Sequence, residues 1–121
     1  SLVVAHRKKF AIPVVGITGS NGKTIVKEWL HQLLEEHYAV IRSPKSYNSQ
    51  IGVPLSVWEL NETHQLALFE AGISQSGEMD NLQRIIQPTI GIFTNIGEAH
   101  SEGLGKGSLF VVRLPTLGLP D

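Results

Sequence analysis

The chain of 121 residues contains no cysteine, and its positive and negative side chains almost balance. The lack of cysteine excludes disulfides, thiolate metal sites and thiol catalysis, and it fits a reducing compartment. Ten basic residues against eleven acidic ones give a formal net charge of -1, which is unlike the basic surface of a nucleic-acid-binding protein. No apolar run reaches the length of a membrane-spanning helix. We therefore expect a cytoplasmic protein that binds neither nucleic acid nor membrane.

Short apolar segments alternate with segments of helical periodicity, as in an ordinary globular domain. The expected strands are residues 12–18, 38–42, 65–71 and 89–94, and the expected helices begin near Lys23, at Gly52 and at Glu78. This alternation predicts an α/β fold with a mainly parallel sheet. The apolar face of the first helix is expected to pack on that sheet and comprises Ile25, Val26, Trp29, Leu30, Leu33 and Leu34.

The two ends of the chain give weaker signals. We interpret the basic run from His6 to Lys9 as a solvated patch. Residues 108–121 contain two prolines and show no clear period, so we expect an irregular, atypical tail there. The predicted organisation is therefore one domain over residues 1–107 followed by a tail over 108–121.

A glycine-rich turn, TGSNGKT from Thr18 to Thr24, joins the first strand to the first helix. Backbone N–H groups in such a turn, together with the helix N-terminus, bind phosphate oxygens. Lys23 can reach the terminal phosphates, and the Thr24 hydroxyl can ligate Mg²⁺. The strict phosphate-loop pattern has a glycine where this chain has Ile17, so the match is to a variant loop. The predicted phosphate-binding residues are Gly19, Ser20, Asn21, Gly22, Lys23 and Thr24.

Three further polar groups follow expected strands or precede a helix. Glu70 comes at the end of the third strand, where a carboxylate could hold Mg²⁺ or could simply face solvent. Asn95, Glu98 and His100 follow the fourth strand, and an imidazole near phosphate could ligate a second divalent ion. The loop with Asn48 and Ser49 could contact a substrate, or it could only cap the next helix. Because ligands bind beyond the carboxyl ends of parallel strands, these groups are candidates for one site.

Four segments in this order resemble the Mur ligase family: GITGSNGKT, YNSQIGVPLSVWEL, FEAGISQSGEM and IGIFTNIGEAHSEG. The likeness covers roughly residues 10–105 and implies part of the family's central ATP-binding domain, a P-loop NTPase-like sheet flanked by helices. The segments are most similar to members that join D-Ala-D-Ala to a UDP-MurNAc-tripeptide in peptidoglycan synthesis. The amino-acid sequence of these segments also resembles members that are fused to an alanine racemase, so a racemase domain is expected in the parent protein.

The resemblance implies that ATP phosphorylates a substrate carboxylate and that an amine then attacks the acyl phosphate to give an amide. The family's pattern places phosphate and Mg²⁺ at Lys23 and Thr24, a metal at Glu70, and a second metal at His100. Lys23, Glu70 and His100 are therefore the expected catalytic residues. The pattern also places the nucleotide beside Asn95. It assigns Asn48 and Ser49 to the phosphates or the sugar-nucleotide substrate.

The chain departs from the family beyond the histidine motif. The family carries a carbamylated lysine on a helix there, whereas this chain has only Lys106, which comes too soon, and Arg113. We therefore expect this chain alone to be inactive as a ligase. Two alternatives are a ligase similar to folylpolyglutamate synthase, which the second and fourth segments disfavour, and a non-catalytic nucleotide-binding fragment.

Overall fold

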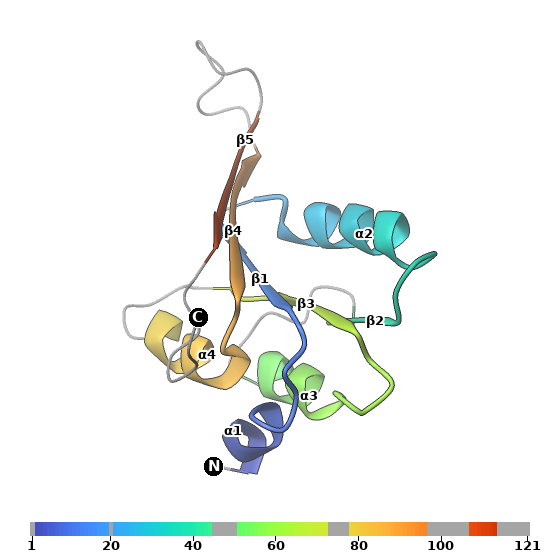
Figure 1. The fold of residues 1–121 in the computed structure, drawn as a ribbon. Helices are drawn as coiled ribbons and strands as arrows, with labels where there is room; N and C mark the ends of the chain where they lie inside the picture. The colour runs from blue at the N-terminus through green and yellow to red at the C-terminus, as the bar shows by residue number, and fades with distance from the viewer. Residues whose placement is uncertain (1, 20, 45–50, 73–77, 97–106, 114–121) are drawn as a thin grey trace.

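A computed structural model of the chain describes residues 2–19, 21–44, 51–72, 78–96 and 107–113 (Figure 1). Side chains are described for these residues except 78, 79, 95, 96 and 107–113. The elements in chain order are α1 (Leu2–Arg7), β1 (Val14–Gly19), α2 (Lys23–Leu34), β2 (Val40–Arg42), α3 (Gly52–Trp58), β3 (Leu66–Glu70), α4 (Glu78–Ile86), β4 (Ile90–Ile96) and β5 (Gly107–Arg113).

The strands form one sheet in the order β2-β3-β1-β4-β5. The first four are parallel, and β5 runs antiparallel to β4. At the carboxyl end of central β1, Ile17 pairs with Glu70 on one side and Gly19 pairs with Thr94 on the other. The predicted α/β fold with a mainly parallel sheet is confirmed, and the sheet register brings the ends of β1, β3 and β4 together.

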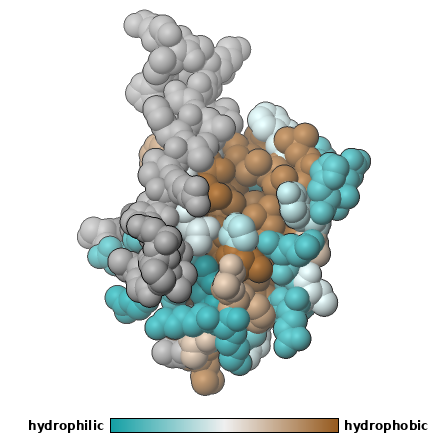
Figure 2. Space-filling model, in the orientation of Figure 1, coloured by the Kyte–Doolittle hydropathy of each residue, from teal (hydrophilic) through white to brown (hydrophobic). Residues whose placement is uncertain are grey.

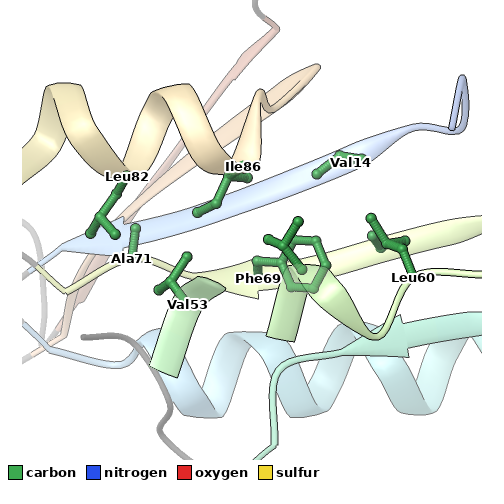
Figure 3. Packing of buried hydrophobic residues seen from close by; sticks show 9 residues of the cluster. Val14, Val53, Leu60, Phe69, Ala71, Leu82 and Ile86 are labelled. Atoms are coloured by element: carbon green, nitrogen blue, oxygen red, sulfur yellow. The ribbon is translucent and has the colours of Figure 1, made fainter. Parts of the chain in front are cut away.

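Alternation along the strands builds two cores, one on each face of the sheet. Val14 of β1 belongs to a cluster with residues of α3 and α4, whereas its neighbour Val15 packs with Val26 of α2. Successive side chains of a strand point to opposite faces, so a fully apolar strand needs cover on both. Figure 1 shows α2 on one side of the sheet and α1, α3 and α4 on the other. Figure 3 shows the core between the sheet and the helices α3 and α4, in which Phe69 of β3 packs among side chains from both helices.

The apolar face predicted for α2 is partly wrong. Ile25, Trp29 and Leu33 are 47%, 59% and 70% exposed, and Val26 and Lys27 are the buried residues of the helix. The six residues assigned to that face spread over roughly half of the helix circumference, more than one flat sheet can cover. Figure 2 shows hydrophobic atoms at the surface in the upper right, where Figure 1 places α2. The buried face of α2 is therefore rotated away from Ile25, Trp29 and Leu33, and it includes the charged residue Lys27.

The basic run near the N-terminus is not a solvated patch throughout. It lies partly in α1, and the Arg7 side chain is only 5% exposed. Its guanidinium donates to the carbonyl oxygens of Ile86, Gln87 and Phe10 at 2.5, 2.6 and 2.8 Å. Burial lowers the pKa of Arg7. The carbonyls at the end of α4 carry partial negative charge, which favours a cation there. Lys8 and Lys9 are exposed, as predicted.

The irregular tail expected over 108–121 is also wrong in its first part. Residues 107–113 form β5, paired with β4 from Gly107 opposite Ile96 to Arg113 opposite Ile90. The segment GSLFVVR is rich in residues that favour strands, and an antiparallel partner needs only a local return of the chain. Residues 114–121 lie outside the described part. Among the described residues, no helix is long and apolar enough to cross a membrane.

Candidate functional site

The turn between β1 and α2 depends on two glycines with positive φ. Gly22, which precedes α2, has φ 85°, and Gly19, which ends β1, has φ 136°. Such angles disfavour any residue with a Cβ. A Cβ on Gly19 would also lie 1.9 Å from the carbonyl oxygen of Thr94 on β4. The turn can therefore approach β4 closely only because glycine occupies position 19.

Thr94 fixes the other side of this turn. Its hydroxyl lies 2.6 Å from the carbonyl oxygen of Asn21 and 3.2 Å from that of Thr18, and the side chain is fully buried. Because a hydroxyl has one proton, it donates to one of these acceptors at a time. The Thr18 hydroxyl donates in turn to the carbonyl of Ala71, just beyond β3. The turn is thus held by the ends of both neighbouring strands.

The first turn of α2 presents positive charge to this place. Gly22 is the N-cap and supplies no side-chain hydrogen bond, so the cap leaves the first backbone N–H groups of the helix for other acceptors. The Lys23 ammonium group donates to the carbonyl of Gly19 at 2.8 Å and thus folds back over the turn. N–H groups at a helix start and a nearby lysine together favour an anionic ligand.

Thr24 and Glu70 bring two metal-binding oxygens together. The Thr24 hydroxyl donates to Oε1 of Glu70 at 3.0 Å, which leaves the hydroxyl oxygen's lone pairs available to a cation. A hydroxyl and a carboxylate are ligands that suit Mg²⁺ when phosphate oxygens and water complete the octahedron. In the described ranges no three His, Cys, Asp or Glu residues gather as a metal site. This donor set fits a magnesium ion that is held largely by a bound phosphate.

Glu70 is buried, and a buried lysine lies beside it. The Lys27 ammonium nitrogen lies 2.7 Å from Oε2 of Glu70, and neither side chain is exposed. Lys27 also donates to the carbonyl of Ser43 at 2.6 Å, and the Ser43 hydroxyl accepts from the backbone N–H of Glu70 at 3.2 Å. The alternative of a solvent-facing glutamate at a strand end is therefore wrong, because Glu70 is buried. The Lys27 cation on α2 compensates the charge of its carboxylate inside the protein.

The structure brings together most of the predicted phosphate and metal residues that it describes. Gly19, Asn21, Gly22, Lys23, Thr24 and Glu70 lie at or beside the β1–α2 turn. The predicted residues Ser20, Asn48, Ser49, Glu98 and His100 lie outside the described residues. Asn95 belongs to β4, two strands from Glu70, but its side chain is not described.

Sequence reasoning missed Lys27, Ser43 and Thr94. Lys27 had a usable signal, because it follows Lys23 by four positions and Thr24 by three, and such residues share one face of a helix. Thr94 ends the fourth strand expected from sequence, residues 89–94, and a parallel sheet places that strand end beside the predicted turn. Ser43 had no comparable signal, since its contacts depend on how β2 aligns with β3.

Comparisons with known proteins agree with this geometry. Residues 17–108 match the family model described as the Mur ligase middle domain. The chain is 39% identical over 105 residues to the UDP-N-acetylmuramoyl-tripeptide–D-alanyl-D-alanine ligase of Bacillus subtilis, covering 87% of this chain and 23% of that protein. It is 43% identical over 99 residues to the ligase of the same name from Treponema pallidum, covering 81% and 22%.

Solved structures give the same result. The chain superposes on MurF from Acinetobacter baumannii with a TM-score of 0.75 and 36% identity, covering 83% of this chain and 22% of that one. It superposes on MurF ligase from Thermotoga maritima in complex with ADP with a TM-score of 0.68 and 32% identity, covering 84% and 24%. The chain thus spans under a quarter of the length of these proteins. Over that span it belongs to the Mur ligase family, and residues 17–108 are its middle domain.

Proposed function

We propose that this chain is the ATP-binding core of a ligase that joins D-Ala-D-Ala to a UDP-MurNAc-tripeptide in peptidoglycan synthesis. The observation that carries the proposal is the junction of Lys23, Thr24 and Glu70 at the start of α2. A glycine turn, a helix N-terminus, a lysine and a hydroxyl bonded to a carboxylate are the parts that a nucleoside triphosphate with Mg²⁺ requires. The similarity to a ligase crystallised with ADP supports the same ligand.

Each residue has a role in this proposal. Backbone N–H groups of the turn, including those of Asn21 and Gly22, bind phosphate oxygens. Lys23 exchanges the carbonyl of Gly19 for the β- and γ-phosphates when the nucleotide arrives, and it stabilises the charge that develops on the transferring phosphoryl group. Thr24 and Glu70 would hold Mg²⁺, whose charge would help to neutralise the terminal phosphates.

The remaining assignments extend the proposal to residues whose side chains the structure does not describe. We assign a second metal to His100, nucleotide contacts to Ser20 and Asn95, and phosphate or sugar-nucleotide contacts to Asn48 and Ser49. Their support is the family membership of residues 17–108. The domain boundary after residue 107, the cytoplasmic location and a fused alanine racemase domain stay predictions.

The reaction that we propose for the whole protein is transfer of the γ-phosphoryl group of ATP to the tripeptide carboxylate. The amine of D-Ala-D-Ala then attacks the acyl carbon, phosphate leaves, and an amide bond forms. The chain's own contribution is to hold the triphosphate in line for this transfer, since positioning and electrostatic stabilisation dominate such reactions.

The decisive experiment measures nucleotide binding and turnover separately. Isothermal titration with a non-hydrolysable ATP analogue, with Mg²⁺ or with EDTA, should show binding that Mg²⁺ strengthens. Phosphate release is then followed with ATP, UDP-MurNAc-tripeptide and D-Ala-D-Ala, omitting each in turn. Release that needs both substrates supports the ligase, whereas the lack of any Mg²⁺-dependent binding would contradict the nucleotide site itself.

A second candidate is a nucleotide-binding module without catalysis. Among residues 101–121 the only lysine is Lys106, which comes too soon after His100 to match the family's lysine, and this departure favours the module. Binding without substrate-dependent phosphate release would identify this case. A ligase of the folylpolyglutamate type is the third alternative, and release with a folate and glutamate in place of the two substrates would identify it.

A further inference from the structure

We propose that Lys27 is a positioning residue for the magnesium site, holding the Glu70 carboxylate so that Oε1 faces Thr24. The inference rests on the proposed function, because it concerns how the chain prepares for Mg²⁺ with a nucleotide. It adds a residue that acts through Glu70 and contacts neither phosphate nor metal.

The geometry assigns different partners to the two carboxylate oxygens. Lys27 lies 2.7 Å from Oε2, and the Thr24 hydroxyl lies 3.0 Å from Oε1. The terminal torsion of a glutamate is broad, so a carboxylate without fixed partners samples many orientations. With its two oxygens held by different residues of α2, Glu70 presents one defined oxygen to Thr24.

The position of the Lys27 ammonium group is itself fixed by a second partner. Its ammonium group also donates to the Ser43 carbonyl at 2.6 Å, and the Ser43 hydroxyl accepts from the backbone N–H of Glu70. Helix α2, the residue after β2 and the end of β3 are thus joined around one carboxylate. A second carboxylate oxygen, Oε2 of Glu28, lies 3.7 Å from the Lys27 ammonium nitrogen. A lysine that only balanced charge would not need the links to Ser43.

Two effects of Lys27 on a metal oppose each other. Its positive charge repels a nearby divalent cation, whereas its contacts orient the carboxylate that attracts the cation. Residues that orient metal ligands typically contribute about 10–100-fold to metal affinity or activity. We infer that orientation outweighs repulsion here, because the Lys27 charge is offset by two carboxylates, Oε2 of Glu70 at 2.7 Å and Oε2 of Glu28 at 3.7 Å.

The test uses the ratio of analogue Kd in EDTA to analogue Kd in Mg²⁺, measured by titration of the full chain. In Lys27→Met, which keeps an unbranched side chain one atom shorter and removes its charge, this ratio should fall about 10–100-fold. Affinity in EDTA should change much less. Lys27→Arg restores a cation and should recover part of the ratio.

The matched control is Arg7→Met, which removes another buried cation, bonded to backbone carbonyls on the opposite side of the sheet. It should lower thermal stability without changing the ratio. An unchanged ratio in Lys27→Met, or a raised one, would overturn the positioning role while leaving the proposed function intact. A wild-type chain without any Mg²⁺ effect would instead overturn the proposed function, and the positioning role with it.

A second measurement does not depend on the folding of a variant. In the wild-type chain, a buried ammonium group bonded to a carboxylate should give a slowly exchanging ¹H–¹⁵N signal for the Lys27 side chain. Adding the ATP analogue with Mg²⁺ should shift this signal more than adding the analogue in EDTA. Equal shifts in the two conditions would contradict the link between Lys27 and the metal.

Discussion

A Cβ atom built on Gly19 lies 1.9 Å from the carbonyl oxygen of Thr94, far closer than an unbonded carbon and oxygen can approach. We predict that Gly19→Ala displaces the turn from β4 and destabilises the fold by at least about 2 kcal/mol, since strained φ and a backbone clash add. Thermal denaturation measures the loss, and analogue binding should fall with it. Gly16→Ala is the control in the same strand, because its Cβ would meet the Pro88 side chain at 3.2 Å and needs only a small adjustment.

Removal of the Lys23 ammonium group should weaken binding of the ATP analogue with Mg²⁺ by about 10–100-fold, the value of a lost charged hydrogen bond or two. The fold should change little in Lys23→Ala, because the group's described partner is one carbonyl of the turn. Lys8→Ala, which removes an exposed lysine of the N-terminal segment, is the control and should bind normally. Normal affinity in Lys23→Ala would refute the phosphate role of the turn.

Replacement of Glu70 by glutamine should separate the metal from the nucleotide. The Mg²⁺-dependent part of analogue binding should fall at least about tenfold, whereas binding in EDTA should change less. An equal loss in both conditions would count against metal ligation. The variant also leaves Lys27 buried without its carboxylate, which costs about 3–5 kcal/mol in comparable buried pairs. Lys27→Met combined with Glu70→Gln should regain part of that stability in urea denaturation.

Much of this arrangement could be predicted from residue order. The short apolar runs of the strands, the glycine turn and the parallel strand ends placed Gly22, Thr24 and Glu70 correctly relative to one another. The errors arise where a residue's partner is distant in sequence. Nothing near Arg7 reveals that the end of α4 supplies its acceptors, and nothing near Ser43 reveals that its hydroxyl accepts from the backbone N–H of Glu70. Helical spacing alone also overestimated how much of α2 a sheet can cover.

The core between β3 and the helices α3 and α4 should be sensitive to truncation. Phe69 is fully buried there, and Phe69→Ala should cost about 3–5 kcal/mol of unfolding free energy through lost burial and a cavity. Phe93, on the neighbouring part of the sheet, is 49% exposed and provides the matched control. Phe93→Ala should cost much less in the same urea titration. Similar losses for the two variants would mean that the described packing is not the main source of stability.

Loss of the Arg7 guanidinium should destabilise the chain by about 3 kcal/mol, because several buried carbonyls lose charged donors at once. Lys8→Met, at the next and exposed position, should stay within about 0.5 kcal/mol of the wild type. Both values come from thermal or urea unfolding. An Arg7→Met variant as stable as Lys8→Met would show that α1 does not depend on this contact.

The hydrogen bonds between Arg7 and the end of α4 join residues that are separated by 79 and 80 positions in the sequence. A ribosome must therefore synthesise most of the domain before the first helix finds its acceptors. Long-range contacts of this kind slow folding, because the intervening loop must close first. We expect the emerging chain to assemble its sheet from the middle outward, with the N-terminal helix docking as one of the last events.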